Sequence, residues 1–137
     1  MLVPLDGSPL AEEALRHAMA VFDCQITVLN VITPVDAGMS EGGILEPDDQ
    51  RHEKARERTD KLITRFEERT DSEDHDVETV VMVGDPADMI LEYVANHDMD
   101  QIVMGGHGGD QWDVTRRLLG TVSTVVVGEA PVTVTVV

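Results

Sequence analysis

The chain has 137 residues, of which 27 are acidic and 10 are lysine or arginine, so its formal net charge is −17. Its hydrophobic content of 42% excludes a disordered protein, and its length predicts a single domain over residues 1–137. No apolar run is long enough to cross a bilayer, and the negative charge would repel nucleic acid. We therefore expect neither a membrane nor a nucleic acid as a partner.

The acidic residues extend from Asp6 to Glu129 and form no separate tail. A docking surface for a basic partner would gather them in a patch, so their spread favours adaptation to a salty, halophilic cytoplasm, where dissolved ions screen the self-repulsion. A cytoplasmic location also fits residues 1–6, which show no signal-peptide pattern. The single cysteine, Cys24, excludes an internal disulfide and fits a reducing compartment.

The first half of the chain predicts a strand, a helix and a second strand. Residues 2–5 form a short apolar strand. Ser8 then offers a helix N-cap, Pro9 suits the first helical position, and apolar residues follow on one helical face. Residues 26–32 are rich in β-branched side chains and predict the second strand. Residues 34–49 contain three glycines and two prolines without a period, so we expect a mobile surface loop there.

The second half continues the alternation of helices and strands. Residues 51–69 contain many acidic and basic side chains beside a stripe of apolar ones. This pattern predicts a long helix with a solvated outer face. Residues 77–83 predict the third strand, and Asp85 and Pro86 then start another helix. A fourth strand is predicted at residues 101–104.

Residues 120–128 carry conflicting signals. Their threonines and the three valines at positions 125–127 prefer a strand. A last strand is predicted at residues 131–137, and it can run parallel to the fourth strand only if a crossover connection joins the two. We therefore predict a helix over residues 120–128, which completes five strands and four helices in alternation.

The predicted fold class is α/β, a five-stranded parallel sheet with helices on both faces, because the strands are continuously apolar and the helices are amphipathic. In such sheets ligands bind beyond the carboxyl ends of the strands, where the strand order switches. Asp6 follows the first strand and Gly105 follows the fourth. If these two strands are neighbours, the loops after them frame one cleft.

A glycine-rich segment follows the fourth strand. It reads Gly105-Gly106-His107-Gly108, and Gly120-Thr121-Val122-Ser123 then opens the last predicted helix. Glycines let the backbone approach a phosphate closely, and free N–H groups at a helix start point at negative charge. The segment therefore indicates an anion cradle and makes a nucleotide the first ligand to consider. A tight turn that binds nothing, with Thr121 and Ser123 as helix caps, is the competing interpretation.

Six short motifs, in this order and at these distances, resemble the universal stress protein family, and the resemblance covers nearly the whole chain. They are Val3-Pro4-Leu5-Asp6-Gly7-Ser8, Leu29-Asn30-Val31-Ile32, Val83-Gly84-Asp85-Pro86-Ala87, Ile102-Val103-Met104-Gly105-Gly106-His107-Gly108, Leu119-Gly120-Thr121-Val122-Ser123 and Pro131-Val132.

The resemblance implies a Rossmann-like fold of the adenine-nucleotide alpha-hydrolase type, with strand order 3-2-1-4-5. It implies a stress-response or regulatory protein that binds an adenine nucleotide, either ATP or AMP. Asp6 and Val31 would lie near the adenine or ribose, Pro4 would be a further binding residue, and Met104 and Gly105 would form the floor of the cleft. The phosphates would be surrounded by Gly108, Gly120, Thr121, Val122 and Ser123.

The chain departs from the family in the glycine-rich segment. Eleven residues, 109–119, separate Gly108 from Gly120, where the nucleotide-binding branch of the family has nine. These residues include Asp110 and Asp113, and carboxylates beside a triphosphate are unfavourable unless a cation offsets them. Mg²⁺ or Mn²⁺ is therefore expected only if ATP is bound. A dimeric stress or regulatory module that binds no nucleotide is the alternative function.

The resemblance also implies a homodimer formed through the terminal strand. Residues 132–137 are apolar or hydroxylated and carry no charged side chain, and such an edge would be hazardous if left open. Catalysis would need a general base within reach of the nucleotide, and the sequence shows no convincing one. We therefore expect a binding protein without catalytic residues or a metal cluster of its own, with slow ATP hydrolysis as its upper limit of activity.

Overall fold

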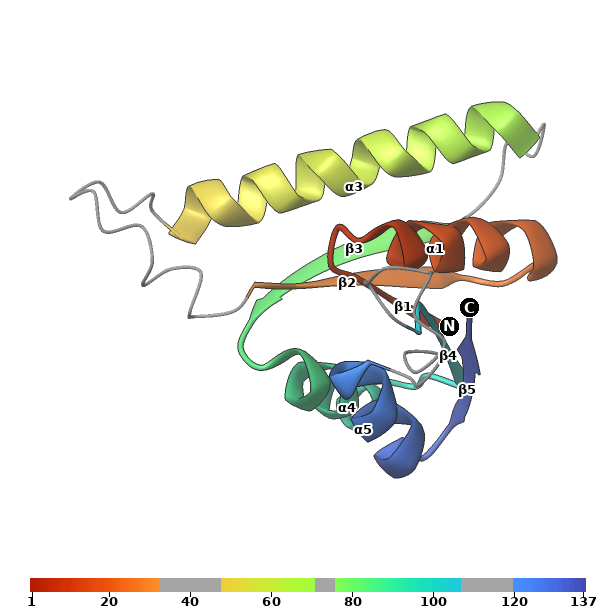
Figure 1. The fold of residues 1–137 in the computed structure, drawn as a ribbon. Helices are drawn as coiled ribbons and strands as arrows, with labels where there is room; N and C mark the ends of the chain where they lie inside the picture. The colour runs from red at the N-terminus through yellow and green to blue at the C-terminus, as the bar shows by residue number, and fades with distance from the viewer. Residues whose placement is uncertain (33–47, 71–75, 107–119) are drawn as a thin grey trace.

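The computed structural model describes residues 1–32, 48–70, 76–106 and 120–137. Within these residues five strands alternate with four helices, as the sequence predicts (Figure 1). None of the described helices has the length and apolar character needed to cross a membrane. In chain order the elements are β1 (Leu2–Leu5), α1 (Pro9–Val21), β2 (Ile26–Ile32), α3 (Asp48–Thr70), β3 (Val77–Val83), α4 (Pro86–Asn96), β4 (Gln101–Met104), α5 (Thr121–Glu129) and β5 (Thr133–Val136).

All five strands are parallel and form one sheet in the order β3-β2-β1-β4-β5, which confirms the predicted fold class and strand order. β1 and β4 are neighbours, with Leu2 level with Ile102. From β1 the sheet continues through β2 to β3, and from β4 it continues in the other direction to β5. The strand order therefore switches between β1 and β4, which is where parallel sheets bind their ligands.

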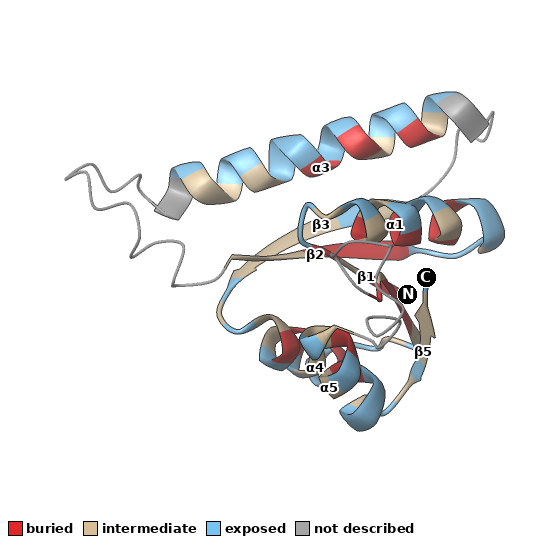
Figure 2. Ribbon diagram, viewed as in Figure 1, coloured by how far each residue is buried: buried red, intermediate tan, exposed pale blue. Residues whose placement is uncertain are grey.

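Helices cover both faces of the sheet, with α1 and α3 on one face and α4 and α5 on the other (Figure 1). Successive residues of a strand point to opposite faces. Val3 of β1 packs into the core beneath α1 and α3, whereas Leu2 packs into the core beneath α4 and α5. Figure 2 shows buried residues on both the central strands and the helix surfaces that meet them. Burial on two sides explains why these strands are continuously apolar.

The two predicted helix starts are confirmed. The Ser8 hydroxyl accepts a hydrogen bond from Ala11 N at 3.2 Å, and the Asp85 carboxylate accepts one from Asp88 N at 3.1 Å. A proline follows each cap at the start of the helix, where its missing N–H costs no hydrogen bond. Both signals are local, because the cap and the groups it satisfies lie within one turn.

The ambiguous segment is a helix, which confirms the prediction from connectivity. α5 spans Thr121–Glu129. Its Val126 is fully buried in the core between the sheet and the helices α4 and α5. Packing of this apolar helix outweighs the modest strand preference of its valines and threonines. Gly120 is the N-cap residue, and no side chain of the described residues makes a capping hydrogen bond there, so the interpretation of Thr121 and Ser123 as caps is wrong.

Three predicted elements have boundaries that differ from the structure, and the smallest difference is a shift of one residue in α5, predicted over 120–128. α3 begins at Asp48 and ends at Thr70, so the last two residues of the predicted loop 34–49 are helical. Residues 33–47 lie outside the described part of the chain. β5 covers only Thr133–Val136 of the predicted 131–137. At its start Pro131 has no N–H to donate to a neighbouring strand, whereas at its end Val137 N still donates to Met104 O at 2.9 Å.

Candidate functional site

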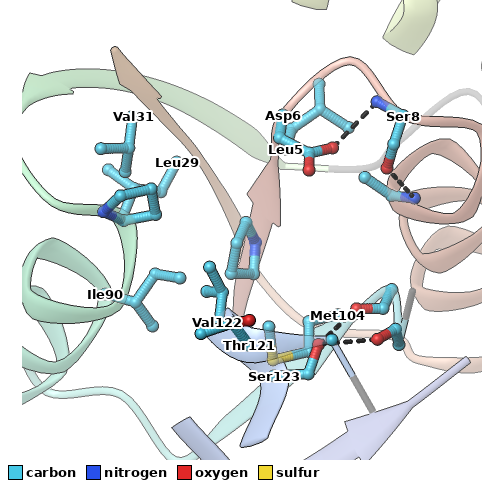
Figure 3. A pocket seen from close by; sticks show the side chains of 16 residues that line it. Leu5, Asp6, Ser8, Leu29, Val31, Ile90, Met104, Thr121, Val122 and Ser123 are labelled. Carbon is cyan, nitrogen blue, oxygen red and sulfur yellow. Dashed lines mark hydrogen bonds between the residues drawn. The ribbon is translucent and has the colours of Figure 1, made fainter. Parts of the chain in front are cut away.

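A cavity of about 230 Å³ lies at the carboxyl ends of β1 and β4, where the strand order switches (Figure 3). β1 and its following loop, β2, α4, the end of β4 and the start of α5 all contribute to its wall. The lining residues are Pro4, Leu5, Asp6, Ser8, Ala11, Leu29, Val31, Pro86, Ile90, Met104, Gly105, Gly106, Gly120, Thr121, Val122 and Ser123.

Nine of the ten residues that the sequence singles out for a binding site line this one cavity, and Gly108 lies outside the described residues. Sequence reasoning missed several apolar members of the wall, above all Leu29 and Ile90. Leu29 precedes Val31 by two positions and therefore lies on the same face of β2, which is a signal that strand periodicity could have provided. Ile90 comes from α4, and only the packing of that helix against the sheet brings it to the cavity.

Asp6 is held in a turn just beyond β1. Its Oδ1 accepts a hydrogen bond from Ser8 N at 2.8 Å, which fixes the carboxylate beside the start of α1. This is the loop hydrogen bond expected for Asp6 if it has no ligand. Its Oδ2 has no hydrogen-bond partner among the residues that the structure describes, so a second acceptor is available at the cavity wall.

Gly105 is required by close packing of β4 against α1. A Cβ atom at this position would lie 2.7 Å from the carbonyl carbon of Leu10 and 2.8 Å from Ala11 N. Both are backbone atoms, so neither can move aside as a side chain could. Glycine is therefore necessary at this position whether or not the cavity holds a ligand.

Backbone contacts tie the start of α5 to the end of β4. The Ser123 hydroxyl donates toward Gly105 O at 3.0 Å and Gly106 O at 3.1 Å, and Gly120 N donates to Gly106 O at 2.6 Å (Figure 3). Ser123 is only 4% exposed, and these bonds satisfy its buried hydroxyl. The hydroxyl therefore positions the helix start against the glycine segment.

The N-terminal end of α5 faces the cavity without a cap. The first N–H groups of a helix have no acceptor within the helix, and in α1 and α4 the Ser8 and Asp85 side chains accept one of them. α5 has no such side-chain bond, and Thr121 and Val122 at its start line the cavity. Its N–H groups and the positive end of its dipole are thus placed to meet an anion.

Most of the other residues of the wall are apolar or glycine, with the hydroxyl residues Ser8, Thr121 and Ser123 among them. Asp6 is the one charged side chain among the described lining residues. The described part of the chain holds no cluster of three or more metal-ligating side chains. Burial, together with the nearby Glu78 carboxylate, raises the pKa of Tyr93, but this residue of α4 packs into the core between α4 and the sheet and does not line the cavity.

Comparison with known proteins agrees with this architecture. No curated protein matches the chain. The solved structure of universal stress protein UspA from Lactobacillus plantarum is 23% identical with a TM-score of 0.71, over 99% of this chain and 94% of that one. A universal stress protein from Archaeoglobus fulgidus is 21% identical with a TM-score of 0.65, over 98% and 95% of the two chains.

A third solved structure is a universal stress protein in complex with cAMP, which is 21% identical with a TM-score of 0.66, over 99% of this chain and 94% of that one. At these identities the likeness establishes the fold. The sequence itself matches the model of the universal stress protein family over residues 1–137. The chain therefore belongs to the universal stress protein family.

Proposed function

We propose that the protein binds an adenine nucleotide in the cavity between β1 and β4 and acts as a stress-response or regulatory binding protein. The observation that carries the proposal is the start of α5, which has no side-chain cap among the described residues and faces a mostly apolar cavity at the switch point of the sheet. A family member in complex with cAMP supports the same ligand class.

The two ends of the cavity suit the two ends of such a ligand. Leu29, Val31 and Ile90 offer an apolar wall for the flat face of a base, and the free Oδ2 of Asp6 can accept a hydrogen bond from a ribose hydroxyl. The N–H groups at the start of α5 would receive the phosphate. Gly105, Met104 and Pro4 shape the space between them.

The charge of the cavity favours a ligand with few phosphates. A helix start supplies roughly half an elementary charge, and no cationic side chain joins it among the described lining residues. AMP or a cyclic monophosphate would thus bind with less repulsion than ATP. We propose that ATP needs Mg²⁺ or Mn²⁺ for the same reason.

The proposal is for binding without efficient catalysis. Of the described lining residues only Asp6 carries a titratable side chain, and one of its oxygens is already hydrogen-bonded to Ser8 N. The alternative is a family member that binds no nucleotide. The packing requirement at Gly105 favours it, because that glycine would be needed without any ligand.

We also propose a homodimer formed through β5. This strand pairs with β4 on one side and is the last strand of the sheet, so its other edge offers unpaired backbone groups. Val134 and Val136 leave that edge without charge. A cytoplasmic location and adaptation to high salt complete the proposal, and the net charge of −17 supports the latter.

Calorimetry with AMP, ADP and ATP, each with and without Mg²⁺, tests the nucleotide site. Thr121 is exposed at the first position of α5 and lines the cavity, so Thr121→Glu puts a carboxylate where the phosphate would lie. Glutamate is favourable at a helix start and leaves the fold intact. We expect AMP to bind at least about tenfold more weakly to this variant, given roughly 3 kcal/mol for like charges 5 Å apart at an effective dielectric constant of 20.

Thr121→Gln is the matched control, because it has the size of the glutamate variant without its charge, and its affinity should stay within about twofold of wild type. Absence of binding heat with all three nucleotides in the wild-type protein would overturn the proposal and favour the family member without a nucleotide. Equal losses in both variants would show that the phosphate is not at the start of α5.

A further inference from the structure

A second cavity, of about 290 Å³, lies on the opposite face of the sheet, beneath α3. It is bounded by the carboxyl ends of β1 and β2, the loop after β1 and one side of α3. α3 and α1 share this face in Figure 1. The two cavities meet at Leu5, Asp6 and Val31, which line both.

Basic side chains gather at this second cavity in a strongly acidic protein. Arg51, Lys54 and Arg58 line it, so it holds three of the 10 lysines and arginines of a chain with a net charge of −17. Their spacing of three and four residues places them on one side of α3. Glu53 and Glu57 are exposed on other sides of the helix, and none of the α3 carboxylates whose side chains the structure describes lines the cavity.

No carboxylate of the described residues forms an ion pair with Arg51 or Arg58. By contrast, Arg65 of the same helix lies 3.7 Å from Glu12 and Arg56 donates to Thr79 O at 3.1 Å. The chain has 27 acidic residues, which is more than enough to supply a carboxylate partner for each of these two guanidinium groups. Two guanidinium groups on one cavity, neither in an ion pair within the described part of the chain, indicate a site for an external anion.

Hydrogen bonds join β2 to α3 beside the cavity. Asn30 Nδ2 donates to Thr59 Oγ1 at 2.8 Å, and Thr59 Oγ1 donates to Ala55 O at 3.0 Å. Thr59 is fully buried, so this chain of hydrogen bonds joins β2 to α3 directly under the basic side chains. At the mouth, Arg58 Nη1 lies 3.9 Å from the position that a Cβ atom on Gly7 would take, so the guanidinium reaches the loop after β1.

We propose that this second cavity binds the phosphate group of a small phosphorylated molecule, at a site separate from the nucleotide site proposed above. Guanidinium groups match phosphate oxygens in pairs, which a chloride or a single carboxylate would not use fully. The volume is at the lower end of the range of about 300–1,000 Å³ for ligand pockets, which suits a small metabolite. The net charge opposes larger polyanions and anionic membrane surfaces.

Asp6 sets the position of the phosphate within the cavity. Its carboxylate lies at the border of the two cavities and already accepts from Ser8 N. Repulsion from this carboxylate favours a phosphate on the α3 side, next to Arg51 and Arg58. The site therefore does not depend on α5, and it can be tested while the first cavity is blocked.

The test is calorimetric titration of the full chain with inorganic pyrophosphate at constant ionic strength. We expect one site per chain, and Arg51→Gln/Arg58→Gln should weaken it at least about tenfold, because two charge-assisted hydrogen-bond donors are lost. Arg51→Lys/Arg58→Lys keeps the charge but loses the paired donors, and an intermediate affinity is expected.

The matched control is Arg16→Gln/Lys61→Gln, which removes the same charge from exposed positions outside the cavity. Its affinity should change less than about twofold, since it alters only the overall field. Equal losses in the two glutamine variants would reduce the effect to net charge and overturn the site. A wild-type protein without measurable pyrophosphate binding would overturn it as well.

Thr121→Glu separates this proposal from the nucleotide site. Pyrophosphate should bind to Thr121→Glu as it does to the wild-type protein, and AMP should bind to Arg51→Gln/Arg58→Gln as it does to the wild-type protein. If Thr121→Glu abolishes pyrophosphate binding and the arginine variant does not, the anion lies at the start of α5. That result would overturn the second site and leave the nucleotide proposal standing.

Discussion

Replacement of Gly105 by alanine isolates the packing role of the glycine segment from any role in binding. The added Cβ atom would lie 2.7 Å from the carbonyl carbon of Leu10, 2.8 Å from Ala11 N and 2.9 Å from Leu10 O. All three belong to the backbone at the start of α1. β4 and α1 must therefore separate by several tenths of an ångström to accept the methyl group.

The expected cost follows from this geometry. Overpacking that forces a backbone shift lowers the free energy of unfolding by about 1–3 kcal/mol. With an unfolding entropy of about 2.1 cal/mol/K per residue, the 137 residues give roughly 0.29 kcal/mol/K. The melting temperature of Gly105→Ala should then fall by about 3–10 °C without any ligand present.

Urea and thermal unfolding followed by circular dichroism, both in concentrated KCl, measure this change. Gly128→Ala is the matched control, because among the described residues no atom beyond its chain neighbours and its own helix backbone lies within 4 Å of a Cβ atom there, and the position is near the end of α5. Alanine in place of a helical glycine should raise stability by about 0.5 kcal/mol. If Gly105→Ala is as stable as wild type, the close approach of β4 to α1 is relieved at no cost and the argument from packing fails.

Three further predictions concern the whole molecule. The melting temperature should rise as KCl increases from dilute to molar, because screening relieves the repulsion of a net charge of −17, and a flat curve would contradict salt adaptation. Removal of residues 132–137 should give monomers or aggregates in sedimentation, since β5 is the proposed dimer edge, and a well-folded dimer would place the interface elsewhere. Burial, and after it the Glu78 carboxylate, raises the pKa of the Tyr93 hydroxyl in the folded protein above its unfolded value of 10.0. The contribution of Tyr93 to the free energy of unfolding should therefore be complete below pH 10.0 and disappear as the pH rises through the higher folded pKa. Tyr93→Phe should lack this alkaline loss, and an identical loss in the variant would assign it to another group.

The sequence by itself determined the elements whose signals are local. Two helix starts could be predicted from a capping residue followed by a proline, Ser8 with Pro9 and Asp85 with Pro86. Such a signal is local, because a cap and the N–H groups it satisfies lie within one turn. The alternation of apolar strands and amphipathic helices determined the parallel sheet. The helix α5 could also be predicted, because two parallel strands need a crossover connection, and this requirement outweighs the strand preference of its valines.

Most of the candidate site could also be predicted from the sequence, because the residues that follow β1 and β4 must lie close together once those strands are neighbours. Asp6, Gly105 and the segment starting at Gly120 were identified in this way. Ile90 was not, since its place in the wall depends on how α4 packs against the sheet.

Only the tertiary structure decided the features that join distant segments. Gly105 is needed because β4 meets the backbone of α1, more than ninety positions earlier in the chain. The charge pattern of α3 is that of an ordinary solvated helix in the sequence, and only the packing of α3 over the end of β2 turns Arg51 and Arg58 toward a shared cavity. Such contacts depend on the positions of whole elements, and no local pattern of residues encodes them.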